Sequence, residues 1–231
     1  MQSRKVLVTG ASSGIGLALA KRLLDEGHRV VALARRAMPL SHAALIAEQL
    51  DLSASESGQS LKRVLREHND IDAVVSNAGE GQFGSLENFS ASQIRESIDN
   101  NLTSHLLLAR AALGVLKQQP RSDLVIVGSE AAINGAAQGT LYCAAKFGLR
   151  GFAQALRAES ATANLHVGIV NPGMTRTPFF DALAFEPGAD PDNALAVDDV
   201  VDAILAMLYA GDNAVIDEIN LSPLKKVVKK K

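Results

Sequence analysis

The sequence is poor in the residues that build cross-links and metal centres. It contains one cysteine, Cys143, and no tryptophan among its 231 residues. A single cysteine excludes an internal disulfide and a thiolate metal cluster within the chain, and we expect it to be a small core residue. The histidines lack the spacing typical of metal ligands: His28, His42, His68, His105 and His166. The sequence therefore predicts no metal site.

Charge of one sign and long apolar runs are lacking as well. The 23 lysines and arginines nearly balance the 25 aspartates and glutamates, which gives no reason to expect nucleic acid or an anionic membrane as the main partner. No apolar run approaches the roughly 20 residues that span a bilayer, and the first twenty residues show no signal pattern. We therefore expect a cytoplasmic protein whose partners are small molecules.

Short β-branched runs alternate with longer helical patterns, which indicates βαβ units around a parallel sheet. The expected strands are Lys5–Thr9, Arg29–Ala34, Ile46–Leu52, Ile71–Ser76, Asp123–Gly128, His166–Val170 and Ala214–Leu221. The expected helices are Gly14–Glu26, Ser55–Glu67, Ser90–Lys117, Gln138–Ser160 and Asp198–Leu208. Several strands are apolar at almost every position, as strands covered on both faces are. The sequence predicts an α/β, Rossmann-like, doubly wound parallel sheet of about seven strands with helices on both faces.

No repeat, linker or shift in composition divides the chain, so we expect one domain over residues 1–231. Only about ten residues separate the second and third strands, which predicts a brief or missing helix there. Residues 223–231 are strongly basic, with Lys225 and Lys231 at the ends of the lysine-rich run. We expect a disordered, solvated tail, and an electrostatic docking role is the alternative.

A glycine-rich segment directly follows the first expected strand and opens the first expected helix. It reads Thr9-Gly10-Ala11-Ser12-Ser13-Gly14-Ile15-Gly16. Gly10 can form the tight turn, Gly14 lets the backbone approach a pyrophosphate, and Gly16 lets the helix pack closely on the sheet. The helix N-terminus adds unpaired N–H groups and partial positive charge. We predict dinucleotide binding by Gly10, Ser12, Ser13, Gly14, Ile15 and Gly16, and a purely structural turn is the alternative.

The end of the second strand lacks the acidic residue that would hold a ribose 2′-hydroxyl. Ala34 stands in that place, followed by Arg35 and Arg36. A guanidinium binds a 2′-phosphate with charge-assisted hydrogen bonds, which a carboxylate would repel. This favours NADP(H) over NAD(H), although paired arginines at a strand end are often only solvated surface.

Three residues carry proton chemistry. Tyr142 and Lys146 are four apart in a helical stretch, so they share one helical face, and Ser129 ends the preceding apolar strand. A fixed lysine charge is expected to lower the pKa of the tyrosine from ~10. Tyr142 would then act as general acid or base, with Ser129 hydrogen-bonding the reacting oxygen. A bland surface pair is the alternative for any isolated Tyr-x-x-x-Lys.

These residues together resemble the short-chain dehydrogenase/reductase family in its compact single-domain branch. The resemblance covers about residues 4–222 and rests on motifs in family order: Thr9-Gly10-x-x-x-Gly14-x-Gly16, Asn77-Ala78-Gly79, Asn101, Ser129, Tyr142-x-x-x-Lys146 and Pro172-Gly173-x-x-x-Thr177. It implies an oxidoreductase that transfers hydride between NADP(H), or less favourably NAD(H), and a small carbonyl or alcohol substrate.

The resemblance also assigns roles to individual positions. Lys146 would bind the nicotinamide ribose as well as tune Tyr142, and Asn101 would hold a water in a proton relay. Asp51 would contact adenine, followed by the backbone of Leu52. The remaining expected cofactor contacts are Asn77, Ala78 and Gly79 after the fourth strand, and Pro172, Gly173, Thr175 and Thr177 after the sixth. Asn77 is alternatively a strand-bracing residue, and Asn171-Pro172-Gly173 would mark a turn in any protein.

Two departures from the family pattern concern the cofactor and the substrate. Ser13 stands where many NADP-dependent members carry Arg or Lys, so a 2′-phosphate would rest on Arg35 alone. The segment Phe179–Ala196 carries three phenylalanines among Gly and Pro residues, which predicts a mobile apolar lid or, alternatively, a surface loop. Leu141 and residues 136–139 would form the opposite wall.

Other function classes stay open. The helices around 90–117 and 138–160 resemble the family's dimer surface, so we expect a homodimer or homotetramer. A dinucleotide-binding regulator without turnover would need the glycine loop but not Ser129, Tyr142, Lys146 and Asn101. A non-redox lyase or epimerase on the same scaffold would use the cofactor without net consumption. The sequence does not identify the substrate.

Overall fold

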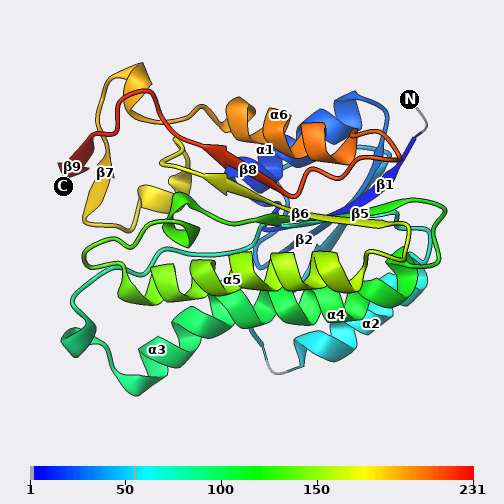
Figure 1. Ribbon diagram of the computed structural model, residues 1–231, viewed down its shortest axis with the longest axis horizontal. Coiled ribbons are helices and arrows are strands. Elements are labelled where there is room, and N and C mark those ends of the chain that lie inside the picture. Colours follow the sequence, from blue (N-terminus) through cyan, green and yellow to red (C-terminus); the bar gives the residue numbers. More distant parts are fainter. Residues whose placement is uncertain (1–2, 55) are drawn as a thin grey trace.

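The computed structural model describes residues 3–54 and 56–231 and places a seven-stranded parallel sheet at its centre (Figure 1). The strand order is β3-β2-β1-β4-β5-β6-β8. The strands are β1 (Lys5–Thr9), β2 (Arg29–Ala34), β3 (Leu45–Gln49), β4 (Ala73–Ser76), β5 (Ser122–Val127), β6 (Leu165–Pro172) and β8 (Glu218–Leu221). The predicted doubly wound fold is confirmed, and no helix joins β2 to β3.

Helices cover both faces of the sheet (Figure 1). One face packs against α1 (Gly14–Asp25) and α6 (Val197–Leu208), and the other against α2 (Ser57–Glu67), α4 (Ser104–Leu116) and α5 (Thr140–Glu159). The predicted start of α2 at Ser55 lies outside the described residues. No described helix has both the length and the apolar composition needed to cross a bilayer.

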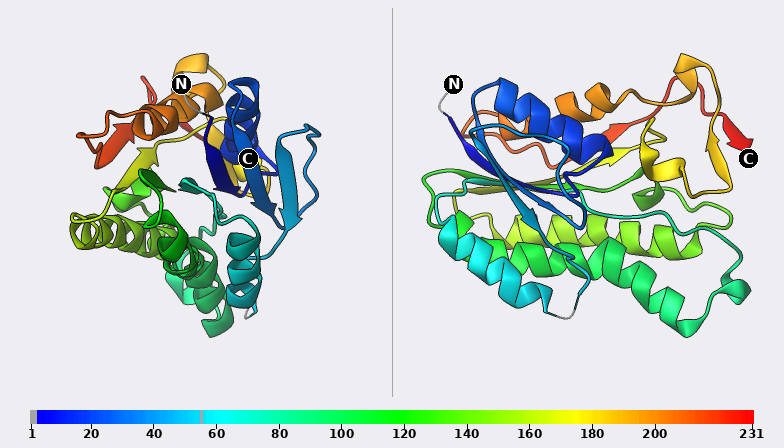
Figure 2. Two further views of the ribbon diagram at one scale, coloured as in Figure 1. Left: turned by 90° about the vertical axis from the view of Figure 1, so that its right-hand side faces the viewer. Right: turned by 180° about the vertical axis from the view of Figure 1, so that it is seen from behind.

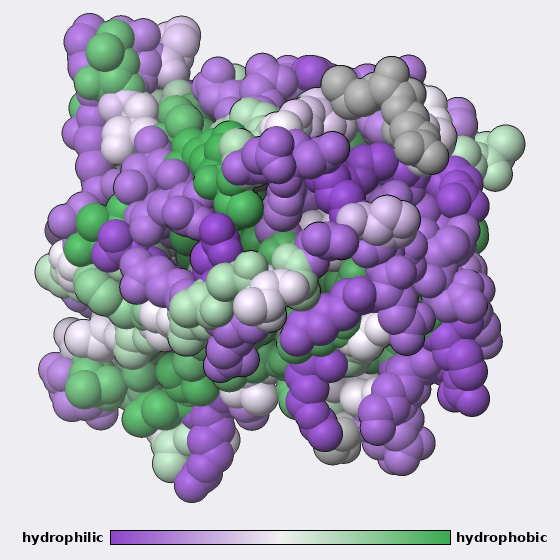
Figure 3. Space-filling model, turned by 45° about the vertical axis from the view of Figure 1, so that its right-hand side comes forward, coloured by the Kyte–Doolittle hydropathy of each residue, from purple (hydrophilic) through white to green (hydrophobic). Residues whose placement is uncertain are grey.

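The two faces explain why the strands are apolar at successive positions. In β1, Val6 and Val8 pack with α1 and α6, whereas Leu7 packs with the helices of the opposite face. All three are fully buried. Since side chains alternate along a strand, a strand buried on both faces needs an apolar residue at each position. Polar side chains are left for the outer helix faces, and hydrophilic residues cover most of the face shown in Figure 3.

The helical stretch expected over 90–117 is confirmed, but it is not one regular α-helix. The chain forms α3 (Ala91–Ile98), a π-helical turn at Asp99–Thr103, and then α4. Asn101 lies in this turn, fully buried, and its Nδ2 donates to the Ser97 carbonyl at 3.0 Å. A π turn inserts one extra residue and redirects the backbone, and such turns are common at functional sites. The insertion brings the Asn101 side chain under the loop that follows β4.

The basic tail forms a strand, contrary to the expected disorder. β9 (Val228–Lys230) pairs antiparallel with β7 (Phe185–Pro187), which lies in the segment expected to act as a lid (Figure 2). Ion pairs accompany the pairing, with Lys229 Nζ 3.4 Å from Glu186 and Lys225 Nζ 3.2 Å from Asp192. The lysine side chains form ion pairs with carboxylates, and the backbone of the tail forms hydrogen bonds with β7. These partners lie far away in the sequence, so the local pattern of the tail does not predict them.

Candidate functional site

The glycine loop forms a cradle at the carboxyl end of β1. Gly10 and Gly14 have φ values of 65° and 55°, in the left-handed region that favours glycine. A Cβ at position 16 would lie 2.5 Å from the Gly10 carbonyl oxygen, so only glycine fits there. Ser13 is the N-cap of α1, but its side chain makes no capping hydrogen bond among the described residues. Ser12 lies in this loop, and Ile15 lies in the first turn of α1. The free N–H groups of the first turn suit a pyrophosphate.

The loop after β4 is fixed against the glycine cradle. Asn77 Nδ2 donates to the Thr9 carbonyl at 3.0 Å, and the backbone N–H groups of Asn77 and Ala78 donate to Thr9 Oγ1 at 2.9 and 3.0 Å. Asn77 therefore braces β1 and β4, which is the alternative role that the sequence left open. A Cβ at position 79 would lie 3.7 Å from Lys146 Nζ, so the backbone of Gly79 lies directly beside the lysine head group.

The two arginines after β2 extend toward the glycine cradle and the loop after β4. Arg35 Nη2 lies 3.0 Å from a carboxylate oxygen of Glu80, and Arg36 Nη2 donates to Ser13 Oγ at 3.0 Å. Arg35 thus lies beside the loop after β4 and is already paired with the carboxylate of Glu80. Glu80 is a residue that the motif-based expectation missed, because the carboxylate lies outside every motif and only its distance from Arg35 identifies it.

Asp51 and Leu52 have different environments. Asp51 Oδ1 accepts hydrogen bonds from the Ser53 N–H at 2.9 Å and the Ser53 hydroxyl at 2.7 Å. Burial acts to raise the pKa of the Asp51 carboxyl, but these hydrogen bonds and the charge of Arg35 outweigh it and lower the pKa. The Leu52 side chain is buried in the core beside β2. An ionised Asp51 held by Ser53 can accept a hydrogen bond from an adenine amino group.

The three residues expected to carry proton chemistry come together at the end of β5. Ser129 follows the strand, and its Oγ accepts a hydrogen bond from the Ala131 N–H at 3.2 Å. Tyr142 and Lys146 lie on α5 and are buried. Lys146 Nζ donates to the Val127 carbonyl at 3.2 Å and lies 5.6 Å from the centroid of the Tyr142 ring. The Ser129 hydroxyl, the Tyr142 phenol and the Lys146 ammonium are thus gathered near the carboxyl end of β5.

The pKa values in this cluster depart from the expectation that Lys146 lowers the pKa of Tyr142. Burial raises the pKa of the Tyr142 phenol to about 12, although a hydrogen bond with Ser129 acts to lower it. Burial also lowers the pKa of the Lys146 ammonium to about 8. Loss of water disfavours the charged form of both groups, the phenolate and the ammonium. The phenol is therefore protonated at neutral pH.

The Asn101 side chain holds the loop after β4 in place. Its Oδ1 accepts a hydrogen bond from the Glu80 N–H at 3.0 Å, while its Nδ2 is held by Ser97. Both polar atoms of the side chain are therefore engaged in the π turn and the loop. The side chain positions Glu80 and the adjoining Gly79, whose Cβ would lie only 3.0 Å from Asn101 Oδ1.

The segment after β6 faces the glycine cradle. Pro172 ends β6, and the Gly173 N–H donates to the Leu221 carbonyl at 2.8 Å. Thr175 is buried and donates to the Gly173 carbonyl at 3.0 Å. The side chain of Thr177 lies 3.4 Å from the position that a Cβ on Gly14 would occupy. The loops after β1 and β6 therefore lie against each other at the carboxyl ends of the parallel strands, where such sheets bind their ligands.

Aromatic side chains surround the tyrosine. The Phe83 ring lies 5.2 Å from the Tyr142 ring and 5.0 Å from that of Phe185, between centroids, and Phe179 lies 5.9 Å from Tyr142. Phe180 contacts Phe185 in turn, with centroids 5.9 Å apart. The lid segment was expected, but Phe83 was missed, although a lone phenylalanine in a Gly-rich loop after the Asn-Ala-Gly motif could have signalled it. The wall suits an apolar substrate.

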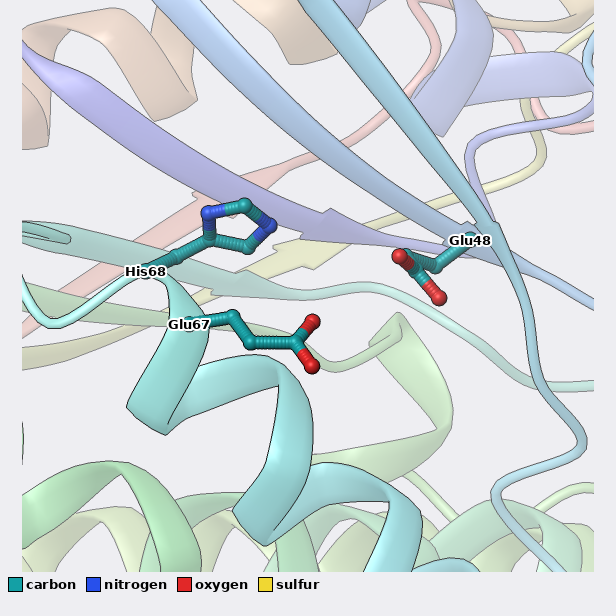
Figure 4. Close-up of side chains that lie close together, drawn as sticks. All are labelled: Glu48, Glu67 and His68. Atoms are coloured by element: carbon teal, nitrogen blue, oxygen red, sulfur yellow. The ribbon is translucent and has the colours of Figure 1, made fainter.

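A separate cluster of possible metal ligands lies at the end of α2. Glu48, Glu67 and His68 each place one potential ligand atom within 4.8 Å of the others (Figure 4). Arg63 bridges the two carboxylates, with its Nη atoms 2.8 Å from Glu48 and 2.9 Å from Glu67. A guanidinium thus already supplies the positive charge there, and we assign no metal to this cluster.

Comparison with known proteins agrees with this geometry. The family model for short chain dehydrogenases matches residues 4–186. The chain is 32% identical over 209 residues to retinol dehydrogenase 8 of Bos taurus, covering 82% of this chain and 66% of that protein. It is 36% identical over 188 residues to a 3-dehydrosphinganine reductase of Arabidopsis thaliana, covering 77% of this chain and 57% of that protein. The chain therefore spans about two thirds or less of the length of these relatives.

Solved structures show the same fold. An alcohol dehydrogenase from the archaeon Thermococcus sibiricus, complexed with 5-hydroxy-NADP, superimposes with a TM-score of 0.86 at 25% identity, covering 98% of this chain and 99% of that one. A 4-hydroxyisoleucine dehydrogenase complexed with NADH has a TM-score of 0.85 at 21% identity, covering 96% and 98%. The glycine cradle, the sheet order and the match of the family model over most of the sequence lead to one conclusion: the chain belongs to the short-chain dehydrogenase/reductase family.

Proposed function

We propose that this protein is an oxidoreductase that transfers hydride between a nicotinamide dinucleotide and a small carbonyl or alcohol substrate, with NADP(H) preferred to NAD(H). The observation that carries the proposal is the position of Ser129, Tyr142 and Lys146, gathered in a buried cluster at the same end of the sheet as the glycine cradle. The nicotinamide supplies or accepts the hydride when bound. The protein's own residues then have to orient the reactants and move the proton.

Tyr142 is the proposed proton donor. Because burial raises the pKa of the phenol to about 12, its hydroxyl is protonated at neutral pH and can donate to a carbonyl oxygen. Ser129 Oγ would hydrogen-bond the same oxygen and so stabilise the charge that develops there. Alcohol oxidation would need the phenolate, which is scarce at neutral pH with this pKa.

Lys146 is proposed to hold the ribose hydroxyls and to balance the charge beside the phenol. With a pKa of about 8, its side chain is mostly an ammonium at pH 7 and keeps three donors, one of them on the Val127 carbonyl. The backbone of Gly79 lies directly beside its Nζ. Loss of the lysine should weaken both cofactor binding and turnover.

The cofactor preference rests on Ala34 and Arg35. Ala34 puts no carboxylate where a ribose 2′-hydroxyl would bind, and Arg35 offers a guanidinium to a 2′-phosphate. Related structures are complexed with either dinucleotide form, 5-hydroxy-NADP or NADH. The aromatic wall around Tyr142 supports an apolar carbonyl compound as substrate.

The proposal is tested by fluorescence titration of NADPH and NADH into the purified protein, followed by a screen of apolar carbonyl compounds for NADPH oxidation. We expect tighter binding of NADPH, loss of that preference in Arg35→Ala, and turnover with part of the screen. Equal effects of Arg35→Ala on both cofactors would contradict the assignment of Arg35. Binding without turnover on any compound would indicate a regulator instead of an enzyme, and product formation without NADPH consumption would indicate a lyase or epimerase.

We also propose that α4 and α5 pack against a second copy in a homodimer or homotetramer. Phe147 on α5 is 45% exposed, and packing of α5 against a second copy would cover this large apolar side chain. Light scattering at micromolar concentration should therefore give a mass above that of one chain. A monomer alone would contradict this proposal.

A further inference from the structure

Glu80 lies between Arg35 and the loop after β4, and the proposed hydride and proton transfer give it no role. It directly follows Gly79 in the loop after β4, and its backbone N–H donates to Asn101 Oδ1 at 3.0 Å. One carboxylate oxygen accepts a hydrogen bond from Asn100 Nδ2. The other lies 3.0 Å from Arg35 Nη2, so the side chain joins the end of β2 to the loop after β4.

We propose that Glu80 is a specificity-determining residue that limits the preference for NADP(H) over NAD(H) by competing with the 2′-phosphate for Arg35. This inference rests on the proposed role of Arg35 in binding that phosphate. A cofactor with a 2′-hydroxyl has no phosphate to place there and does not need to displace Glu80.

The competition follows from charge and position. A phosphate monoester carries about −1.5 to −2 charge at pH 7, so it cannot share one guanidinium with a neighbouring carboxylate without repulsion. The Arg35 and Glu80 side chains are 57% and 38% exposed, so water screens the pair and its strength is modest. The expected penalty on NADPH binding is therefore a factor of about 1.5 to five, and not an exclusion.

Glu80 is a better competitor than the second carboxylate near Arg35. Asp51 directs Oδ1 at Ser53, which supplies two hydrogen bonds to it. Glu80, in contrast, is held by Asn100 and by its own backbone bond to Asn101 in the position that faces Arg35. Because these contacts restrain the loop, less conformational entropy is lost when the ion pair forms.

Substitution of Glu80 by Gln removes the charge and keeps an oxygen that can accept the Asn100 hydrogen bond. The matched control is Glu87→Gln, which changes the net charge by the same amount at an exposed residue that makes no ion pair within the described residues. Dissociation constants for NADPH and NADH are measured by fluorescence titration for the wild type, both single variants, Arg35→Ala, and the double variant Arg35→Ala/Glu80→Gln. Thermal melting shows that each variant is folded.

We expect Glu80→Gln to tighten NADPH binding about 1.5- to fivefold, with a clearly smaller change for NADH and no effect of Glu87→Gln. The gain should shrink at high salt and vanish in the Arg35→Ala background. A Glu80→Gln protein that binds both cofactors as Glu87→Gln does would overturn the inference, as would an equal gain without Arg35. If Arg35→Ala itself leaves the NADPH preference unchanged, the proposed phosphate site fails, which is a separate result.

Discussion

Replacement of Gly16 by alanine should damage both the fold and the cofactor site. A Cβ at this position would lie 2.5 Å from the Gly10 carbonyl oxygen and 2.7 Å from Asn77 Nδ2, whereas ordinary contact begins near 3.4 Å. The nearest atom belongs to the backbone, and the second to a side chain that already braces β1 and β4. Neither can rotate away without breaking a hydrogen bond or moving the loop.

The size of the effect follows from this geometry. The loop would have to move by about 0.9 Å, the difference between 2.5 and 3.4 Å, and overpacking of this kind costs about 1–3 kcal/mol. The moving atoms form the cradle itself, and a displacement near 1 Å in a binding constellation can cost about a hundredfold. We therefore expect Gly16→Ala to unfold at a lower urea concentration and to bind NADPH about ten- to a hundredfold more weakly.

Gly114→Ala provides the control. Gly114 lies on an exposed part of α4, and a Cβ there would meet nothing within 4 Å. Alanine inside a helix should stabilise the protein by up to about 1 kcal/mol and leave NADPH binding unchanged. Urea unfolding and NADPH titration of both variants decide the matter. A Gly16→Ala protein as stable as the wild type, with the same NADPH dissociation constant, would refute the close-approach argument.

Two further predictions concern His105 and the tail. Burial lowers the pKa of the His105 imidazole to about 3 from 6.5, so the fold holds it neutral, and its contribution to the free energy of unfolding is complete above pH 6.5 and is lost as the pH falls toward 3. His105→Asn should make the free energy of unfolding, measured with urea, fall less steeply as the pH is lowered, by up to about 1.4 kcal/mol per pH unit. The exposed control His42→Asn should leave this slope unchanged. Equal slopes in the two variants would contradict the prediction. Deletion of residues 225–231 should remove the β7–β9 pairing and expose residues 184–190 to limited proteolysis. It should also raise KM for apolar substrates without weakening NADPH binding. Unchanged proteolytic cleavage would show that the tail does not hold the lid segment in place.

The sequence was most informative where a function depends on local spacing. Glycines directly after an apolar strand define a cradle because both the turn and the helix start lie within a few residues. The same holds for Tyr142 and Lys146, which one helix places on one face. The alternation of strands and helices predicted the parallel sheet for the same reason, since each βαβ unit is a local pattern.

The features that the sequence did not reveal depend on partners far away in the chain. β9 exists because Val228 meets Pro187, and nothing near the tail predicts that pairing. The Arg35–Glu80 ion pair joins residues from two loops. The π turn at Asn101 does not interrupt the apolar pattern of the helices around it, so the hydrophobic periodicity of the sequence does not reveal the turn. The pKa of Tyr142 depends on burial, which spacing alone does not specify.

The most direct test of proton transfer by Tyr142 is the rate of NADPH oxidation by the Tyr142→Phe variant, with a carbonyl compound that the wild type reduces. Phenylalanine keeps the contacts with Phe83 and Phe179 but has no hydroxyl to donate. We predict that kcat falls by about a hundredfold or more, the range for loss of a general acid, while the NADPH dissociation constant changes less than about twofold. A kcat equal to that of the wild type would contradict the proposed role of Tyr142 and the mechanism built on it.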